Sequence, residues 1–221
     1  MGNVYCMADI HNDRKRFTAM LKIIKFSTED RLYILGDIFG LGPDPLGLYR
    51  EILKYDNIIP VRGNNDDILA RSIRENNDES DVYRVIRKRL TRTDLQNLAT
   101  WIEKIDLQKE IEVEGEKYLL AHVETTDQPE TKNDGFFMRG EELTRRFLLE
   151  GVKGYISVIG DYPTDLIRYV VQDFPEFPNK IWTNRWKNVY SIDCGNAYRW
   201  NLPDVARLSC LRLNDKKEFY V

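Results

Sequence analysis

Residue types that bind metal ions follow several apolar runs in this chain of 221 residues. Asp9 and His11 follow the run "NVYCMA", Asp37 follows "RLYILG", and Asn64 follows "NIIPVRG". The chain has only two histidines, and the second, His122, follows the run "EKYLLA". Each residue alone fits an ordinary turn. Turn formation alone does not explain why ligand-type side chains follow one apolar run after another.

These five residues suit a centre with two metal ions. Asp9 and His11 are two positions apart, so in an extended chain their side chains point the same way and could hold one ion. Asp37 could bridge to a second ion, which Asn64 and His122 could complete. Carboxylate, amide and imidazole ligands together suit Mn²⁺, Fe or Zn²⁺. Two ions about 3.5–4 Å apart activate a water and clamp a phosphoryl group for in-line attack.

The elements that must position these residues alternate between strand and helix. Residues 3–9, 31–37 and 57–64 are apolar runs typical of strands, and residues 14–26 and 44–55 have helical spacing or a helix start signal. Such alternation predicts a parallel sheet built of βαβ units. In these sheets ligands bind at the carboxyl ends of the strands, where the polar residues lie.

The remainder of the chain is predicted to be helical first and then rich in strands. Residues 66–106 have a helical pattern, and Thr93 with Gln96 is the expected capping box of the last helix there. Two β-hairpins are predicted, with turns at residues 114–115 and 214–215.

Composition limits the classes of partner and compartment. With 33 basic and 36 acidic residues, the net charge of −3 gives no general attraction to nucleic acid or membrane. The three cysteines are odd in number and far apart, and no apolar stretch is long enough to span a bilayer. We therefore expect a cytoplasmic protein with neither nucleic-acid nor membrane partners. Its oligomeric state does not follow from composition.

The order of the motifs resembles that of the calcineurin-like metallophosphoesterases, especially the bacterial and phage-type Ser/Thr protein phosphatases. The family pattern is D-x-H, G-D-x-x-D-R-G, G-N-H-E/D, H-A-G, G-H-T-P-T and D-x-G. The matching strings are DIH (9–11), GDIFGLG (36–42), GNND (63–66), HVE (122–124), GDYPT (160–164) and DCG (193–195). The resemblance implies an α/β fold, a two-sheet β-sandwich flanked by helices. It also implies a single domain over residues 1–221, with a helical insertion at about 66–106.

The resemblance further implies two divalent metal ions, with Mn²⁺ favoured over Fe or Zn²⁺, and a metal-bound hydroxide that attacks a phosphate ester. The substrate would be a phosphoprotein or a small phosphoester. The implied ligands are Asp9, His11, Asp37, Asn64, His122 and Asp161, the last of which replaces the histidine of G-H-T.

The proton donor of the family pattern is absent. Asn65 occupies the position of the histidine that donates a proton to the leaving group, and Gly40 occupies that of its orienting aspartate. General acid catalysis contributes about 10²–10⁴-fold, so its loss would weaken the reaction or change its specificity. Because Gly40 also fits the G-D-x-x-G-x-G-P-x-P form of other branches, a phosphodiesterase is one alternative. A pseudophosphatase that serves as a binding or regulatory module is the other.

Positively charged phosphate contacts also differ from the family pattern. Leu41 stands where relatives carry one arginine, and Gly140 stands at the second, with Arg139 one residue away. Arg62, Arg139 and Arg199 are the candidates for the missing charge. Tryptophans 182, 186 and 200 fall in predicted loops, where packing is the expected role and stacking on a substrate is the alternative.

Overall fold

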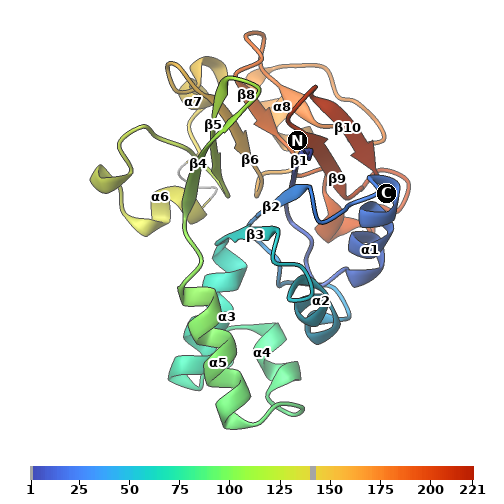
Figure 1. Cartoon of the computed structure of the whole chain (residues 1–221), viewed down its shortest axis with the longest axis vertical. Coiled ribbons are helices and arrows are strands. Elements are labelled where there is room, and N and C mark those ends of the chain that lie inside the picture. The colour runs from blue at the N-terminus through green and yellow to red at the C-terminus, as the bar shows by residue number, and fades with distance from the viewer. Residues whose placement is uncertain (1, 140–142) are drawn as a thin grey trace.

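Two β-sheets packed face to face form the centre of the molecule in a computed structural model, which describes residues 2–139 and 143–221 (Figure 1). The first sheet has the order β10-β9-β1-β2-β3 and the second the order β4-β5-β6-β8-β7. The strands of the first are β1 (Val4–Met7), β2 (Arg31–Leu35), β3 (Ile58–Val61), β9 (Ser209–Arg212) and β10 (Lys217–Tyr220). Those of the second are β4 (Gln108–Val113), β5 (Glu116–Ala121), β6 (Ile156–Ile159), β7 (Trp182–Thr183) and β8 (Val189–Ser191).

Helices cover the outer faces of both sheets, which confirms the predicted two-sheet sandwich (Figure 1). They are α1 (Arg14–Ile23), α2 (Pro45–Ile52), α3 (Asn64–Glu75), α4 (Asp81–Ile86), α5 (Arg92–Glu103), α6 (Asp134–Met138), α7 (Arg145–Glu150) and α8 (Thr164–Val171). The two predicted hairpins are β4–β5 and β9–β10. In the described part of the chain no helix is both long and apolar enough to cross a bilayer.

The predicted capping box of α5 was wrong. Thr91, not Thr93, is the N-cap, and its side chain accepts a hydrogen bond from the backbone of Asp94 while Asp94 reaches back to Thr91. Thr91 has the extended backbone that an N-cap requires, with φ −69° and ψ 163°. Thr93 already lies within the first helical turn.

Parallel pairing brings the ends of the first three strands to one edge of the sheet. β1 pairs with β2 in parallel, and β2 with β3, with Met7 opposite Ile34 and Leu35 opposite Val61. The residues that follow Met7, Leu35 and Val61 therefore emerge together. This confirms the predicted parallel arrangement and places three of the candidate ligand segments side by side.

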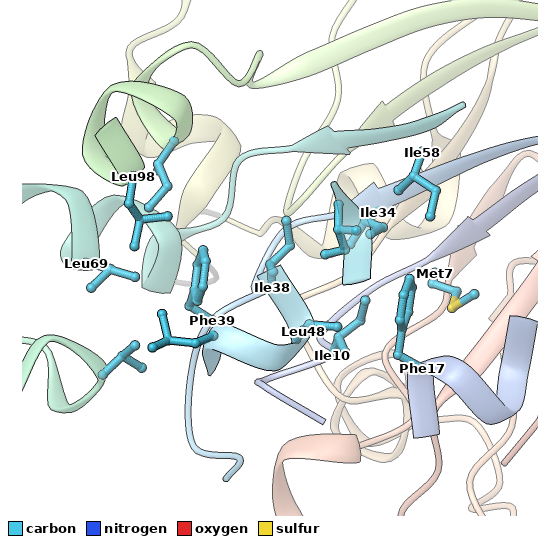
Figure 2. Packing of buried hydrophobic residues seen from close by; sticks show 14 of the residues in the cluster. Met7, Ile10, Phe17, Ile34, Ile38, Phe39, Leu48, Ile58, Leu69 and Leu98 are labelled. Atoms are coloured by element: carbon cyan, nitrogen blue, oxygen red, sulfur yellow. The ribbon is translucent and has the colours of Figure 1, made fainter. Parts of the chain in front are cut away.

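Alternate residues of each central strand enter different cores, as the two-residue period of a strand requires. In β1, Cys6 packs between the two sheets, whereas Tyr5 and Met7 pack under the helices. Figure 2 shows Met7 on this helical side, together with Phe17 of α1 and Leu48 of α2. Because β1 is buried on both faces, the segment that follows it starts from a fixed position.

The helices α3 and α5 hold the segment after β2 in place. Phe39, two residues beyond Asp37, is fully buried in the same cluster as Leu69 of α3 and Leu98 of α5 (Figure 2). Packing of the helices at 64–103 is thus coupled to the position of a candidate ligand.

We expect Leu98→Ala to lower the free energy of unfolding by about 2–5 kcal/mol, because it leaves a cavity beside Phe39. Asn97→Ala, at the adjacent exposed position of α5, is the control, with an expected change of about 0.5 kcal/mol or less. Urea unfolding of both variants measures the difference. Equal stabilities would show that α5 does not support the core.

Candidate metal centre

The structure gathers all six candidate ligands at the carboxyl ends of strands from both sheets. Asp9 and His11 follow β1, Asp37 follows β2, Asn64 opens α3 after β3, His122 follows β5 and Asp161 follows β6. In Figure 1 these strand ends meet near the middle of the molecule.

His122 is the centre of one group of ligand atoms. Its Nε2 atom lies 3.0 Å from Asn64 Oδ1 and 3.1 Å from Asp161 Oδ1, and 3.4 Å from Asp37 Oδ1. Its Nδ1 atom lies 2.9 Å from the carbonyl oxygen of Leu35, which can only accept, so Nδ1 carries the hydrogen. A neutral His122 therefore presents a lone pair to three oxygen atoms. This contact needs a proton or a metal cation between the atoms.

A second group forms around His11, and Asp37 joins the two. His11 Nε2 lies 3.7 Å from Asp37 Oδ2 and 3.8 Å from Asp9 Oδ1. One oxygen of Asp37 thus faces His122 and the other faces His11. Asp9, Asp37 and His122 offer ligand atoms within 4.8 Å of one another and are all buried. The donor set fits two divalent ions that share Asp37.

Asp9 and His11 converge for a different reason from the one predicted. β1 ends at Met7, and both residues lie in a turn with positive φ angles of 54° and 49°, not in an extended chain. Asp37 and Asp161 also have positive φ, at 50° and 58°. Left-handed backbone costs energy in residues other than glycine, and it clusters at functional sites.

Burial of several carboxylates together shifts the pKa values of the site. Burial, with Asp193 as the next cause, raises the pKa of Asp9 well above its usual range. Burial would lower the pKa of His122, but the nearby carboxylates, Asp37 foremost, raise it well above the ordinary value. Burial lowers the pKa of His11, which favours the neutral ring that binds metals.

Asp193 and Asn196 contribute to the site in ways that the sequence analysis did not assign. Asp193 is buried, and burial raises its pKa to about 7. The Asn196 side-chain amide donates hydrogen bonds to the carbonyls of Ile10, at 2.9 Å, and Asp9, at 3.4 Å. The DCG string at 193–195 was the available signal, since Asn196 directly follows it.

Asn65 is bound to the carboxylate that joins the two groups. Its backbone N–H donates to Asp37 Oδ1 at 2.9 Å, and its side-chain amide donates to Asp37 Oδ2. Gly40 lies against His11, because a Cβ at position 40 would come within 2.0 Å of His11 Nδ1. An aspartate at Gly40 would therefore collide with a candidate ligand.

The candidate arginines lie in different places. Arg62 is 3.7 Å from Asp67 and from Asp134, and it lines a cavity of about 530 Å³ that contains none of the six ligands. Arg139 lines a second cavity, of about 460 Å³, together with Asn64 and Arg71.

Of the other positions, Arg199 forms an ion pair with Asp13, and Gly140 lies outside the described residues. Arg139 is therefore the candidate that shares a cavity with a ligand, and Arg71 beside it was missed by the sequence analysis.

Comparisons with known proteins agree on the class of fold. A family model described as calcineurin-like phosphoesterase matches residues 2–193. A candidate diadenosine tetraphosphatase of known structure superposes with a TM-score of 0.63 at 16% identity, covering 100% of this chain and 93% of the other. A protein serine/threonine phosphatase from Saccharomyces cerevisiae superposes with a TM-score of 0.61 at 12% identity, covering 96% of this chain and 72% of the other. At these identities the likeness shows the fold alone.

Curated relatives carry one shared description. The symmetrical bis(5'-nucleosyl)-tetraphosphatase of Wigglesworthia glossinidia brevipalpis is 34% identical over 117 residues, which cover 48% of this chain and 42% of the relative. The enzyme of the same name from Nitrosomonas europaea is 28% identical over 124 residues, which cover 53% of this chain and 43% of the relative. The chain thus spans less than half of the length of these relatives.

We expect the affinity for Mn²⁺ to rise with increasing pH. Carboxylates and His122 with raised pKa values hold protons at the lower pH, and a metal ion must displace them. Each displaced proton weakens binding by up to about tenfold per pH unit below its pKa. Equilibrium dialysis at three pH values measures the effect, with Asp127→Asn, an exposed carboxylate, as the control. An affinity independent of pH would contradict this protonation scheme.

Proposed function

Because the chain belongs to the calcineurin-like phosphoesterase family, we propose that it is a metal-dependent hydrolase of phosphodiesters or phosphoanhydrides that have good leaving groups. Dinucleoside tetraphosphates are the proposed substrate class, supported by the names of the curated relatives. This choice replaces the protein phosphatase interpretation as the leading hypothesis. A cytoplasmic location and a single domain stay predictions.

The hydrogen bonding of Asn65 is the observation that favours this substrate class. An amide group is too weak an acid to transfer a proton at neutral pH, and the Asn65 amide already donates a hydrogen bond to Asp37. The leaving group must therefore depart without protonation by this residue. A terminal phosphate oxygen has a pKa of about 6, whereas the alkoxide of serine is far more basic. Cleavage between phosphates thus needs no general acid.

The ligand residues would divide the work between two metal positions. Asp9 and His11 would hold one ion, Asn64, His122 and Asp161 the other, and Asp37 would bridge them. Bound ions would lower the pKa of a water and polarise the phosphoryl oxygens, and we propose Mn²⁺ as the resident ion. The Leu35 carbonyl fixes the His122 ring and its tautomer through Nδ1, as second partners of ligating histidines do.

Arg139 is the proposed phosphate contact on the protein side. It shares its cavity with Asn64, so a phosphate held at the metals would come close to its guanidinium. Arg62 is a weaker candidate, because its guanidinium already lies near two carboxylates.

A panel of substrates tests this function. With Mn²⁺ present, we expect turnover of diadenosine tetraphosphate and bis(p-nitrophenyl) phosphate, and at least about 100-fold less of a phosphoserine peptide, whose leaving group needs an acid. Asp37→Ala should abolish all turnover, whereas Asp127→Asn should leave it unchanged. Equal rates on the peptide and the anhydride would reject the proposed specificity. A chain that binds no metal and turns over none of these compounds would instead fit the pseudophosphatase alternative.

Removal of the Asn65 side chain tests its role separately. We expect Asn65→Ala to slow the hydrolysis of aryl phosphates with good and with poor leaving groups by the same factor. That factor should be below about tenfold, because only one hydrogen bond to Asp37 is lost. The measurement is kcat against the pKa of the leaving phenol. A steeper dependence in the variant would mean that Asn65 assists departure of the leaving group after all.

A further inference from the structure

A third cavity lies at the N-terminal end of α1. Its volume is about 360 Å³, and its walls include Arg14, Lys15, Asp44, Arg199 and Trp200. None of the six candidate ligands lines it. The sequence analysis left the role of the tryptophan open between packing and stacking.

The walls of this cavity are tied to the turn that carries Asp9 and His11. Asp13 lies two residues beyond His11, caps α1 and forms an ion pair with Arg199. On the same loop as Arg199, Asn196 holds the carbonyls of Asp9 and Ile10. These contacts place the cavity beside the turn that carries two of the candidate ligands.

Another part of the cavity wall is tied to the same turn. The Asn12 side-chain amide donates to the carbonyl of Gly42 at 3.2 Å, next to the cavity residue Pro43. The loop at 196–200 runs from the cluster to the cavity.

Trp200 offers a flat aromatic surface here. The residue is 61% exposed although it lines the cavity, so burial in the core does not account for its position. The Arg199 guanidinium lies 3.9 Å from the ring centroid. Arg199 is itself paired with Asp13, so one face of the ring is covered by a guanidinium that is held in place.

Lys15 is the cavity residue that could bind a phosphate through its positive charge. Arg14 is 3.2 Å from Glu51 and 3.6 Å from Asp44, so its charge is compensated. The exposed Lys15 has no ion-pair partner within residues 2–139 and 143–221. An ammonium beside an exposed indole suits a phosphate that carries an aromatic base.

We propose that this cavity is a subsite for the nucleoside end of the substrate, with the base stacked on Trp200 and a phosphate held by Lys15. The inference rests on the proposed function, and it extends that function from the reacting phosphate to the non-reacting end. Stacking uses the face of a base and not its hydrogen-bonding edge, so the subsite accepts purines and pyrimidines alike.

The chain contains a matched control for Trp200. Trp186, between β7 and β8, is 62% exposed, and the preceding Arg185 lies 4.5 Å from its ring centroid. It does not line the cavity. Calorimetric titration of the whole chain with ADP, in Mn²⁺ buffer, should show affinity reduced about tenfold or more in Trp200→Ala, and unchanged within twofold in Trp186→Ala.

The lysine has its own pair of variants. Lys15→Gln should weaken ADP binding about threefold or more but leave adenosine binding unchanged, because adenosine has no phosphate. Lys22→Gln, at an exposed position farther along α1, should leave the affinities for ADP and for adenosine unchanged.

The outcomes separate this subsite from the proposed function. Absence of ADP binding to the wild-type chain, or equal affinities in Trp200→Ala and Trp186→Ala, would overturn the subsite. Turnover of bis(p-nitrophenyl) phosphate by the wild-type chain tests the hydrolase without a nucleoside in the substrate. If that turnover is absent from the wild-type chain while ADP binding still depends on Trp200, the hydrolase proposal fails and the subsite stands.

Discussion

The position of one carboxylate, that of Asp37, organises the candidate centre. Its two oxygens face two histidines from different sheets, His122 at 3.4 Å and His11 at 3.7 Å, and Asn65 binds both oxygens. A buried anion of this kind is unfavourable unless cations or hydrogen-bond donors surround it. Because the neighbouring carboxylates are buried as well, the site needs still more positive charge, which divalent ions would supply.

The rest of the fold serves to hold that carboxylate and its partners together. β2 carries Asp37 in the interior of the first sheet, and β5 brings His122 from the second sheet to the same edge. Phe39 then anchors the chain just beyond Asp37 in the core shared with α3 and α5 (Figure 2). The strand order, the packing between the sheets and the helical segment thus all fix the position of the backbone from Asp37 to Phe39.

Features that depend on local pattern could be predicted from the sequence. The apolar runs located the strands, and parallel pairing explained why Asp9, Asp37 and Asn64 emerge at one edge. The left-handed turn at Asp9 could not be foreseen, because hydrogen bonds to residues 36 and 37 stabilise it. The contact of Asn196 with the carbonyl of Asp9 spans 187 positions, a separation at which periodicity carries no information.

Gly40 limits the substitutions that the site can accept. A glycine there lets the loop pass against the ring of His11, where any Cβ would come within 2.0 Å of Nδ1. An acid pair at positions 40 and 65 could not be introduced by exchanging those two residues alone. The loop would also have to move away from the ring. The close approach of this loop therefore couples the absence of a proton donor to the position of the His11 ring.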